Sequence, residues 1–414
     1  MLSQETIEKL ADYIVQRVEE TNTNILLEIA KTLKKVKDLT PSQAQKIVNI
    51  FRYGGDYNKI KKELAKLTKL TQKDIDKIFE EVAKRDSDFM KQFYDFKNIK
   101  FIPYEKNKKL QRQVRALEIA THNTLTNFTN VIGISIIKNG KKTFMPLARA
   151  YEQSVDRAIL SILQGKSTPN DEIHKIIKEY SSSGLKIVDY GSTYVGKDGK
   201  EHFRTRRLDT AVRMNILDNV RSLQNEINQQ FGEEFGANGV EITVHEAPAP
   251  DHAEVQGRQF EKEQFDNFQN DRLSYDITGR EFPPEHNGHD RRSISQYNCY
   301  HNAFPIVIGV SNPIYSDKQL NDIIKRNNDG FKLDGKQYTM YQGTQMQRNL
   351  ETEIRKAKDY QIMAVETDTP EAIMEAQQRI TTLNNKYKKL CNVSGLKPRN
   401  ERMRVSGYKR KSIK

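Results

Sequence analysis

In the first 130 residues, apolar and polar positions follow the spacing of amphipathic helices. Apolar side chains recur every three or four positions, which places them along one face of an α-helix. Two stretches also carry helix-start signals, in which Thr precedes residues that suit a first helical turn. The pattern predicts separate helices over Ile7–Val18, over Ile25–Leu33, from Thr40-Pro41-Ser42-Gln43 to Gly54-Gly55, from Thr71-Gln72-Lys73-Asp74 to Val82, and over Leu110–Phe128.

The middle of the chain mixes short strand patterns with helices. Ile132–Ile137 is an apolar run followed by Asn139-Gly140, a turn signal. Val240, Ile242 and Val244 alternate with polar residues, which favours a half-buried strand. The same region predicts further strands at Leu185–Tyr190 and Phe304–Val310, and helices over Ala150–Gln164 and Arg206–Phe231.

Residues 246–300 show no clear period and are rich in Pro, Gly and His. A loop this long inside a compact chain is usually functional, a binding surface, or held by a partner. The sequence therefore predicts a long irregular loop that carries much of the candidate chemistry.

Helical spacing returns near the C-terminus, with one stripe over Met346–Ala357 and a further helix from Thr369-Pro370 to Leu390. The fold class expected is helix-rich α+β. Four parts are predicted: a helical N-terminal region (1–130), a central α+β domain with the irregular loop (131–340), a C-terminal helical arm (341–390) and a basic tail (391–414).

Composition narrows the classes of protein. No stretch reaches the roughly 18 consecutive apolar residues that a membrane span needs, and the N-terminus lacks the pattern of a secretory signal. We therefore expect synthesis and folding in the cytoplasm, without membrane contact. Cys299 and Cys391 are too far apart to suggest a disulfide framework.

Positive charge gathers at the C-terminus. Residues 386–414 hold eleven Lys or Arg against one acid, Glu401, and so carry +10 of the chain's net +13. Such a segment attracts polyanions without reading their sequence, although a solvated terminus that binds nothing specific has the same composition. The candidate DNA-binding residues are Lys386, Lys388, Lys389, Lys397, Arg399, Arg402, Arg404, Lys409, Arg410 and Lys411.

Two segments of the irregular region form a distinctive pair. His245 to Gly257 reads HEAPAPDHAEVQG, and Tyr297 to Pro305 reads YNCYHNAFP, followed by Gly309-Val310-Ser311. The order and spacing resemble the minor capsid protein 2 family of phages and prophages of Gram-positive bacteria, which is similar in turn to the Mu-type minor head proteins. The family-motif residues are His245, His252, Gln256, Gly257, Cys299 and His301.

Other segments extend the resemblance over almost the whole chain. Gly184 to Tyr190 with Arg204 to Arg213, and the run from Tyr341 to Lys358, look like further family segments. The resemblance implies a structural, non-catalytic role in the virion head, assembled in the host bacterial cytoplasm. It also implies the portal protein and the major capsid protein as partners, and a role in head assembly and in DNA packaging or ejection. The basic tail fits non-specific contact with phage DNA.

His252, Cys299 and His301 also form a candidate zinc site. A Cys-x-His pair offers a thiolate and an imidazole, a facing loop supplies the third ligand, and His245 or Asp251 would complete a tetrahedron. In the alternative, no cofactor is bound: the histidines bond to backbone carbonyls and Cys299 is a small buried apolar group.

Two enzymatic alternatives arise for a head-packaged effector. His286-Asn287-Gly288-His289-Asp290 superficially resembles a metal-dependent nuclease, but its Gly/Pro-rich surroundings favour a solvated turn. Glu351-Thr352-Glu353 matches the Glu-x-Glu of ADP-ribosyltransferases, but it falls in a predicted helix where Glu351 would pair with Arg355.

The arginines Arg204, Arg206, Arg207 and Arg213 are predicted at the start of a helix. They would bind phosphate or an acidic portal surface, or else form a solvated helix face.

Overall fold

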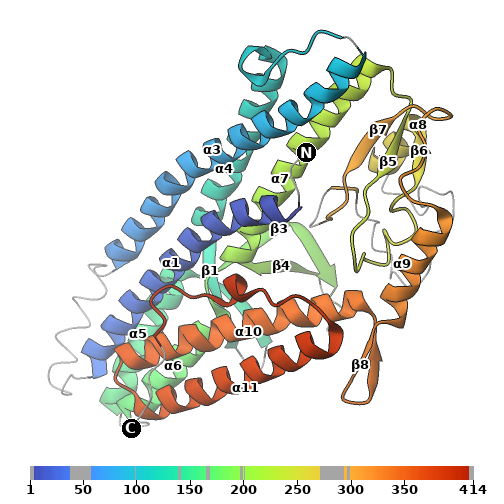
Figure 1. Cartoon of the computed structure of the whole chain (residues 1–414). Coiled ribbons are helices and arrows are strands. Elements are labelled where there is room, and N and C mark those ends of the chain that lie inside the picture. The colour runs from blue at the N-terminus through green and yellow to red at the C-terminus, as the bar shows by residue number, and fades with distance from the viewer. Residues whose placement is uncertain are drawn as a thin grey trace.

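The computed structural model describes residues 4–37, 57–97, 99–138, 141–164, 168–195, 199, 201–270, 293–295 and 299–409. It is a helix-rich α+β fold, as the sequence predicted, in which long helices pack together and small antiparallel sheets lie beside them (Figure 1). The predicted helix from Thr40 to Gly55 lies outside the described residues. Among the described helices, none has the length and apolar content that crossing a bilayer requires.

Four helices build the N-terminal and central part of the core. They are α1 (Gln4–Lys37), α3 (Tyr57–Lys97), α4 (Lys108–Asn130) and α7 (Leu208–Phe235), with a short 3-10 turn, η1 (Tyr104–Lys106), before α4. α7 packs against α1, α3 and α4 (Figure 1). Fully buried side chains such as Ile14, Phe79 and Leu223 fill the space between these helices.

The two helices predicted over Ile7–Val18 and Ile25–Leu33 are one continuous helix, α1. The polar run between them, Thr21 to Asn24, consists of Thr and Asn, which are weak helix formers. Asn22 is buried, where its amide accepts a hydrogen bond from the Leu185 backbone N–H at 3.2 Å. Tertiary contacts thus override the local propensity.

The helix start predicted at Thr71 is also wrong, because α3 runs through it without a break. Ile60, Leu67, Ile75 and Val82 are all buried on this helix. Their spacing in multiples of three to four residues passes through position 71, so a single apolar face spans both sides of the supposed start.

A four-stranded antiparallel sheet in the order β2-β1-β3-β4 lies under these helices. Its strands are β1 (Ile132–Lys138), β2 (Lys141–Pro146), β3 (Lys186–Val195) and β4 (Glu201–Arg207). Lys138 pairs with Lys141 on either side of the predicted Asn139-Gly140 turn, which itself is not described. Helices α5 (Leu147–Gln164) and α6 (Pro169–Ser183) contact β1.

A second sheet, in the order β6-β5-β7, organises the predicted irregular region. Its strands are β5 (Gly239–Ile242), β6 (Gln259–Glu261) and β7 (Ala303–Ile306), and helix α8 (Lys262–Asn270) packs beside it. β6 and α8 are thus regular elements within the region predicted as irregular: Val240 pairs with Phe260, and α8 places Phe265 and Phe268 against the small core of this sheet. Residues 271–292 of that region lie outside the described residues. β7 ends at Ile306, earlier than the predicted Val310.

The C-terminal part is helical, as expected. It comprises α9 (Asp317–Asp329), a hairpin of β8 (Phe331–Leu333) and β9 (Lys336–Tyr338), α10 (Met340–Glu366), α11 (Pro370–Ser394) and the 3-10 helix η3 (Asn400–Met403). Capping boxes begin α9 at Ser316 and α10 at Thr339. Tyr360 and Met363 join the same hydrophobic core as α1 and α7, so this core crosses the predicted boundaries at 130 and 340.

The segment after α11 folds back along α10 instead of projecting as a solvated tail. Met403 and Val405 are buried, and Arg355 Nη1 and Lys358 Nζ donate to the carbonyls of Arg402 and Met403 at 2.8 and 2.6 Å. The predicted tail is an ordered strap as far as Lys409, while Arg410 and Lys411 lie outside the described residues.

Candidate functional site

Five charged side chains meet where α1, β4, α7 and α10 come together. Arg207 Nε lies 3.2 Å from Asp209 Oδ1, and Arg355 Nη2 lies 3.1 Å from Asp209 Oδ2. Glu19 Oε1 is 3.5 Å from Arg355 Nε, and Asp359 Oδ2 is 3.6 Å from Arg207 Nη2. We call these five residues the ion cluster. It ties the first helix of the chain to the C-terminal helices.

The Arg207 guanidinium fits because Gly184 leaves room for it. Gly184 ends α6 with φ +61°, and an added Cβ there would overlap the guanidinium. Both the backbone conformation and the space thus favour glycine at this position.

Proton binding balances the charges of the ion cluster, because three carboxyls face two guanidiniums. Burial and the neighbouring Asp209 raise the pKa of Glu19 well above its usual range. Burial also raises the pKa of Asp359, to about 6. Although burial opposes it, the attraction of Arg207 and Arg355 lowers the pKa of Asp209. Asp209 therefore ionises more readily than an ordinary aspartate, while Glu19 keeps its proton to a higher pH than an ordinary glutamate.

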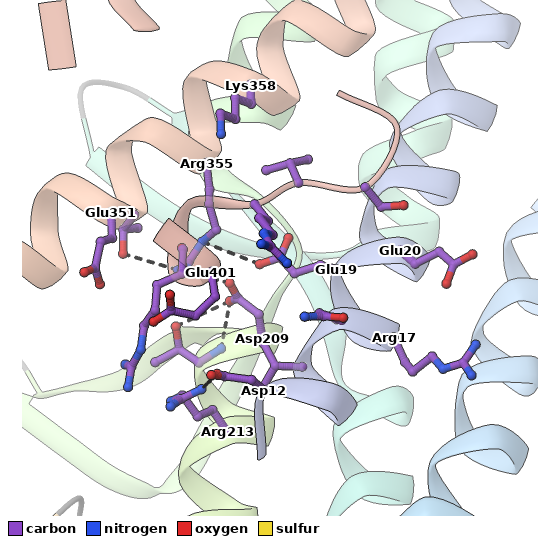
Figure 2. Close-up of a pocket in the computed structure, with 18 of the residues that line it drawn as sticks. Asp12, Arg17, Glu19, Glu20, Asp209, Arg213, Glu351, Arg355, Lys358 and Glu401 are labelled. Atoms are coloured by element: carbon purple, nitrogen blue, oxygen red, sulfur yellow. Dashed lines mark hydrogen bonds and ion pairs between the residues drawn. The ribbon is translucent and has the colours of Figure 1, made fainter. Parts of the chain in front are cut away.

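A cavity of about 670 Å³ opens beside the ion cluster, between α1, α7, α10 and the C-terminal strap. Figure 2 shows Arg355 between Glu19 and Asp209, with Arg213 against Asp12 at the other side. Arg402 reaches Glu8 at 3.2 Å. Acids and bases alternate along the walls, so the cavity is not an anion-selective basic pocket.

The predicted arginine group is divided by the fold. Arg204 and Arg206 lie on β4, Arg207 ends that strand and is the N-cap residue of α7, and Arg213 lies within α7. Arg207 and Arg213 are engaged in internal ion pairs. Arg207 is buried, and Arg213 lines the cavity beside Asp12, so both side chains are engaged within the protein.

Glu351 and Glu353 lie in the middle of α10, where they form internal pairs. The predicted Glu351–Arg355 pair does not form. Glu351 instead binds Arg399 of the strap through two contacts at 2.9 and 3.1 Å, because Arg355 turns toward Asp209. Glu353 contacts Lys356 and Arg379. These pairings use both carboxylates for structure and favour the structural interpretation of the Glu-x-Glu motif over the enzymatic one.

The second candidate site lies in the turns after β5 and the segment before β7. His252, Cys299 and His301 are each at most 2% exposed, and one ligand atom from each lies within 4.8 Å of the others. Cys299 Sγ is 3.2 Å from His252 Nδ1 and 3.4 Å from His301 Nδ1. The fold thus brings together the three residues that the sequence proposed as zinc ligands.

The remaining loop residues support this cluster. Gln256 Oε1 accepts from the His245 backbone N–H at 3.2 Å and lies 3.0 Å from His301 Nε2. The His245 and His301 rings are 4.2 Å apart. Gly257, at φ +69°, donates its N–H to Ile242 O at 2.7 Å and returns the chain to β6. His286, His289 and the rest of that predicted nuclease-like segment lie outside the described residues.

The motif residues and the fold around them can now be compared with known proteins. A family model described as phage minor capsid protein 2 matches residues 2–392. The chain belongs to this family. No curated protein and no solved structure matches it. The family indicates a structural role in a phage capsid, and hence a place in the virion.

The ion cluster of this minor capsid protein was missed in the sequence. A signal was present: Asn22 lies four residues after Val18 and three before Ile25, on the buried face of α1. A polar residue on an apolar stripe points to a buried polar partner. The sequence does not reveal that partner, Asp359, which lies 337 positions away.

Replacing Glu19 and Asp209 tests the charge assignment. Glu19→Gln keeps a neutral group in place and should leave the fold intact. Asp209→Asn leaves two largely buried guanidiniums short of their anion and should lower the free energy of unfolding by about 3–5 kcal/mol. Thermal and urea unfolding of both variants would measure this. Equal destabilisation by the two substitutions would contradict the assignment.

Glu19→Gln should also change how the stability of the protein depends on pH. Folded Glu19 keeps a proton that the unfolded chain releases, so its contribution to stability is fully present below its ordinary pKa of 4.5. That contribution is lost as pH rises through the raised folded pKa. As pH rises above 4.5, the melting temperature of Glu19→Gln should therefore improve relative to that of the original protein; a difference that does not change with pH would argue against a raised pKa of Glu19.

Gly257→Ala tests the tight turn of the motif. The left-handed conformation costs a side chain about 1–2 kcal/mol, and the new methyl would also overlap Leu320 and Val244, at about 1–3 kcal/mol more. Gly236→Ala is the matched control, since Gly236 has φ +70° and open space around it. Urea unfolding should show the larger loss for Gly257→Ala. Similar losses would mean that only the backbone conformation matters.

Proposed function

We propose that this minor capsid protein lies near the portal inside the phage head, where it contacts the portal protein, the major capsid protein and the packaged DNA. The observation that carries the proposal is the family match over residues 2–392. Packaging or ejection of DNA is the stage at which a portal-proximal head protein would act. A protein in that place meets densely packed polyphosphate.

The surface cations of the C-terminal part supply the proposed DNA contact. Lys386 and Lys388 are exposed along α11, and Lys397, Arg404 and Lys409 are exposed on the strap. Lys389 is exposed too but lies 2.5 Å from Asp334. Arg399 and Arg402 pair with Glu351 and Glu8, so we assign them to the fold and leave them out of the DNA-contacting set. Contact with backbone phosphates needs no base readout and is therefore independent of sequence.

Charge removal tests this surface better than deletion of residues 386–414 does. Deletion would also remove Tyr387, Leu390 and Met403 from the core and would damage the fold. The test variant changes Lys386, Lys388, Lys397 and Lys409 to Gln. Duplex DNA binding should weaken, and the salt dependence of log Kd should flatten by roughly 0.9 for each phosphate that the variant no longer neutralises.

A matched control changes four exposed lysines of α3, Lys62, Lys69, Lys73 and Lys77, to Gln. Net charge falls equally in both variants, so a general electrostatic effect would weaken binding equally. Fluorescence anisotropy with two unrelated duplexes at several salt concentrations distinguishes these cases. Binding that survives the C-terminal variant, or equal losses in both variants, would contradict the proposed surface.

Placement near the portal predicts neighbours within the virion. Lysine cross-linking of purified virions, followed by mass spectrometry, should join this chain to the portal protein. Its abundance should be of the order of the portal protein and far below that of the major capsid protein. Abundance equal to the major capsid protein, or cross-links to the shell without any to the portal, would refute the placement.

A further inference from the structure

The arrangement of protons around His301 is fixed by its neighbours. Gln256 Oε1 accepts the His245 backbone N–H at 3.2 Å, which identifies this atom as the amide oxygen and not the nitrogen. The same oxygen lies 3.0 Å from His301 Nε2, so that nitrogen must carry a proton and donate it. A neutral His301 then presents the lone pair of Nδ1 to Cys299 Sγ, 3.4 Å away.

His252 lies on the other side of the sulfur. Its Nδ1 is 3.2 Å from Cys299 Sγ, while its Nε2 is 3.8 Å from Asp251 Oδ2, which is too far for a hydrogen bond. The hydrogen bond from His301 Nε2 to Gln256 is the arrangement that metal-binding histidines use, because it orients the ring and leaves the inner nitrogen bare. The thiol of Cys299 has a single hydrogen, so it can donate a hydrogen bond to only one of the two Nδ1 atoms at a time.

The two sulfur-to-nitrogen separations are also compatible with a metal site. With bond lengths of about 2.3 Å to sulfur and about 2.05 Å to nitrogen, a tetrahedral zinc ion sets sulfur and nitrogen roughly 3.5 Å apart. The two S···N distances, 3.2 and 3.4 Å, are close to that value. All three side chains are buried and already restricted, so binding a metal would cost little side-chain conformational entropy.

We propose that His252, Cys299 and His301 bind one Zn²⁺ through two imidazole Nδ1 atoms and one thiolate. Two imidazoles and a thiolate suit zinc, whereas Mg²⁺ and Ca²⁺ prefer oxygen ligands. Binding replaces the thiol hydrogen, which leaves as a proton. All three side chains line a cavity of about 240 Å³ that His245 and Tyr300 also line, and a water molecule there would supply the fourth ligand.

The ion would act as a cross-link in a part of the chain with little regular backbone pairing. His252 lies in the turns between β5 and β6, and Cys299 and His301 lead into β7, so the metal would join both neighbours of β5. Tyr300, between the two ligands, lies 4.8 Å from the Arg221 guanidinium of α7 and accepts from Arg348 of α10 at 3.3 Å. The cross-link would thus also hold the second sheet against the helices.

The test begins with the metal content of the full chain purified without chelators. Elemental analysis should find one zinc per chain, and removal by a chelator should lower the melting temperature until Zn²⁺ is added back. Co²⁺ in place of zinc should give a thiolate-to-cobalt charge-transfer band. A chain that contains no zinc and takes up neither ion at micromolar concentration would overturn the proposal, and this result needs no variant to fold.

Variants then assign the ligands. Cys299→Ser should abolish the charge-transfer band, while the matched control Cys391→Ser, at the other buried cysteine, should keep both the band and the zinc. Gln256→Leu leaves all three ligands in place but removes the acceptor for His301, and should weaken zinc affinity about 10–100-fold. An undiminished band in Cys299→Ser, or its loss in a folded Cys391→Ser, would place the metal elsewhere.

Discussion

The fold depends on the ion cluster, because that cluster is stable only when three segments far apart in the sequence are in place together. Buried charges cost several kcal/mol each unless their partners are present. Arg207 and Asp209 from the centre of the chain, Glu19 from α1 and Arg355 from α10 satisfy one another. A partly assembled chain would leave some of these charges buried and unpaired. The N-terminal and C-terminal helices are therefore parts of one cooperative structure built around β4 and α7.

Local patterns predicted the fold class and most elements, since amphipathic spacing records which face of a helix is buried. They failed where tertiary contacts decide. The sequence predicts two helices where α1 is one, yet the amide of Asn22 between them is used inside the protein. Thr71 suggested a helix start, although the apolar face of α3 continues past it. In both cases a local signal was weaker than the contact that the fold supplies.

The candidate sites differ in the same way. His252, Cys299 and His301 stood out in the sequence because His and Cys are few and have strong chemical preferences. The ion cluster uses common residue types, and all its pairs except Arg207 with Asp209 join residues far apart in the sequence, so spacing did not reveal it. The Glu-x-Glu motif shows the converse. Its two acids resembled a catalytic motif, but their ion pairs with Arg399, Lys356 and Arg379 give them structural roles.

The C-terminal charge has two roles that net charge alone cannot separate. Arg399 and Arg402 form ion pairs with Glu351 and Glu8, and these pairs hold the strap against α10 and α1. The cations that point outward lie on α11 and on the strap that these ion pairs hold in place. Because their backbone is already ordered, binding a polyanion costs less conformational entropy than it would for a flexible tail. The inward arginines would thus contribute to the proposed DNA contact indirectly, by holding the outward lysines in a fixed array.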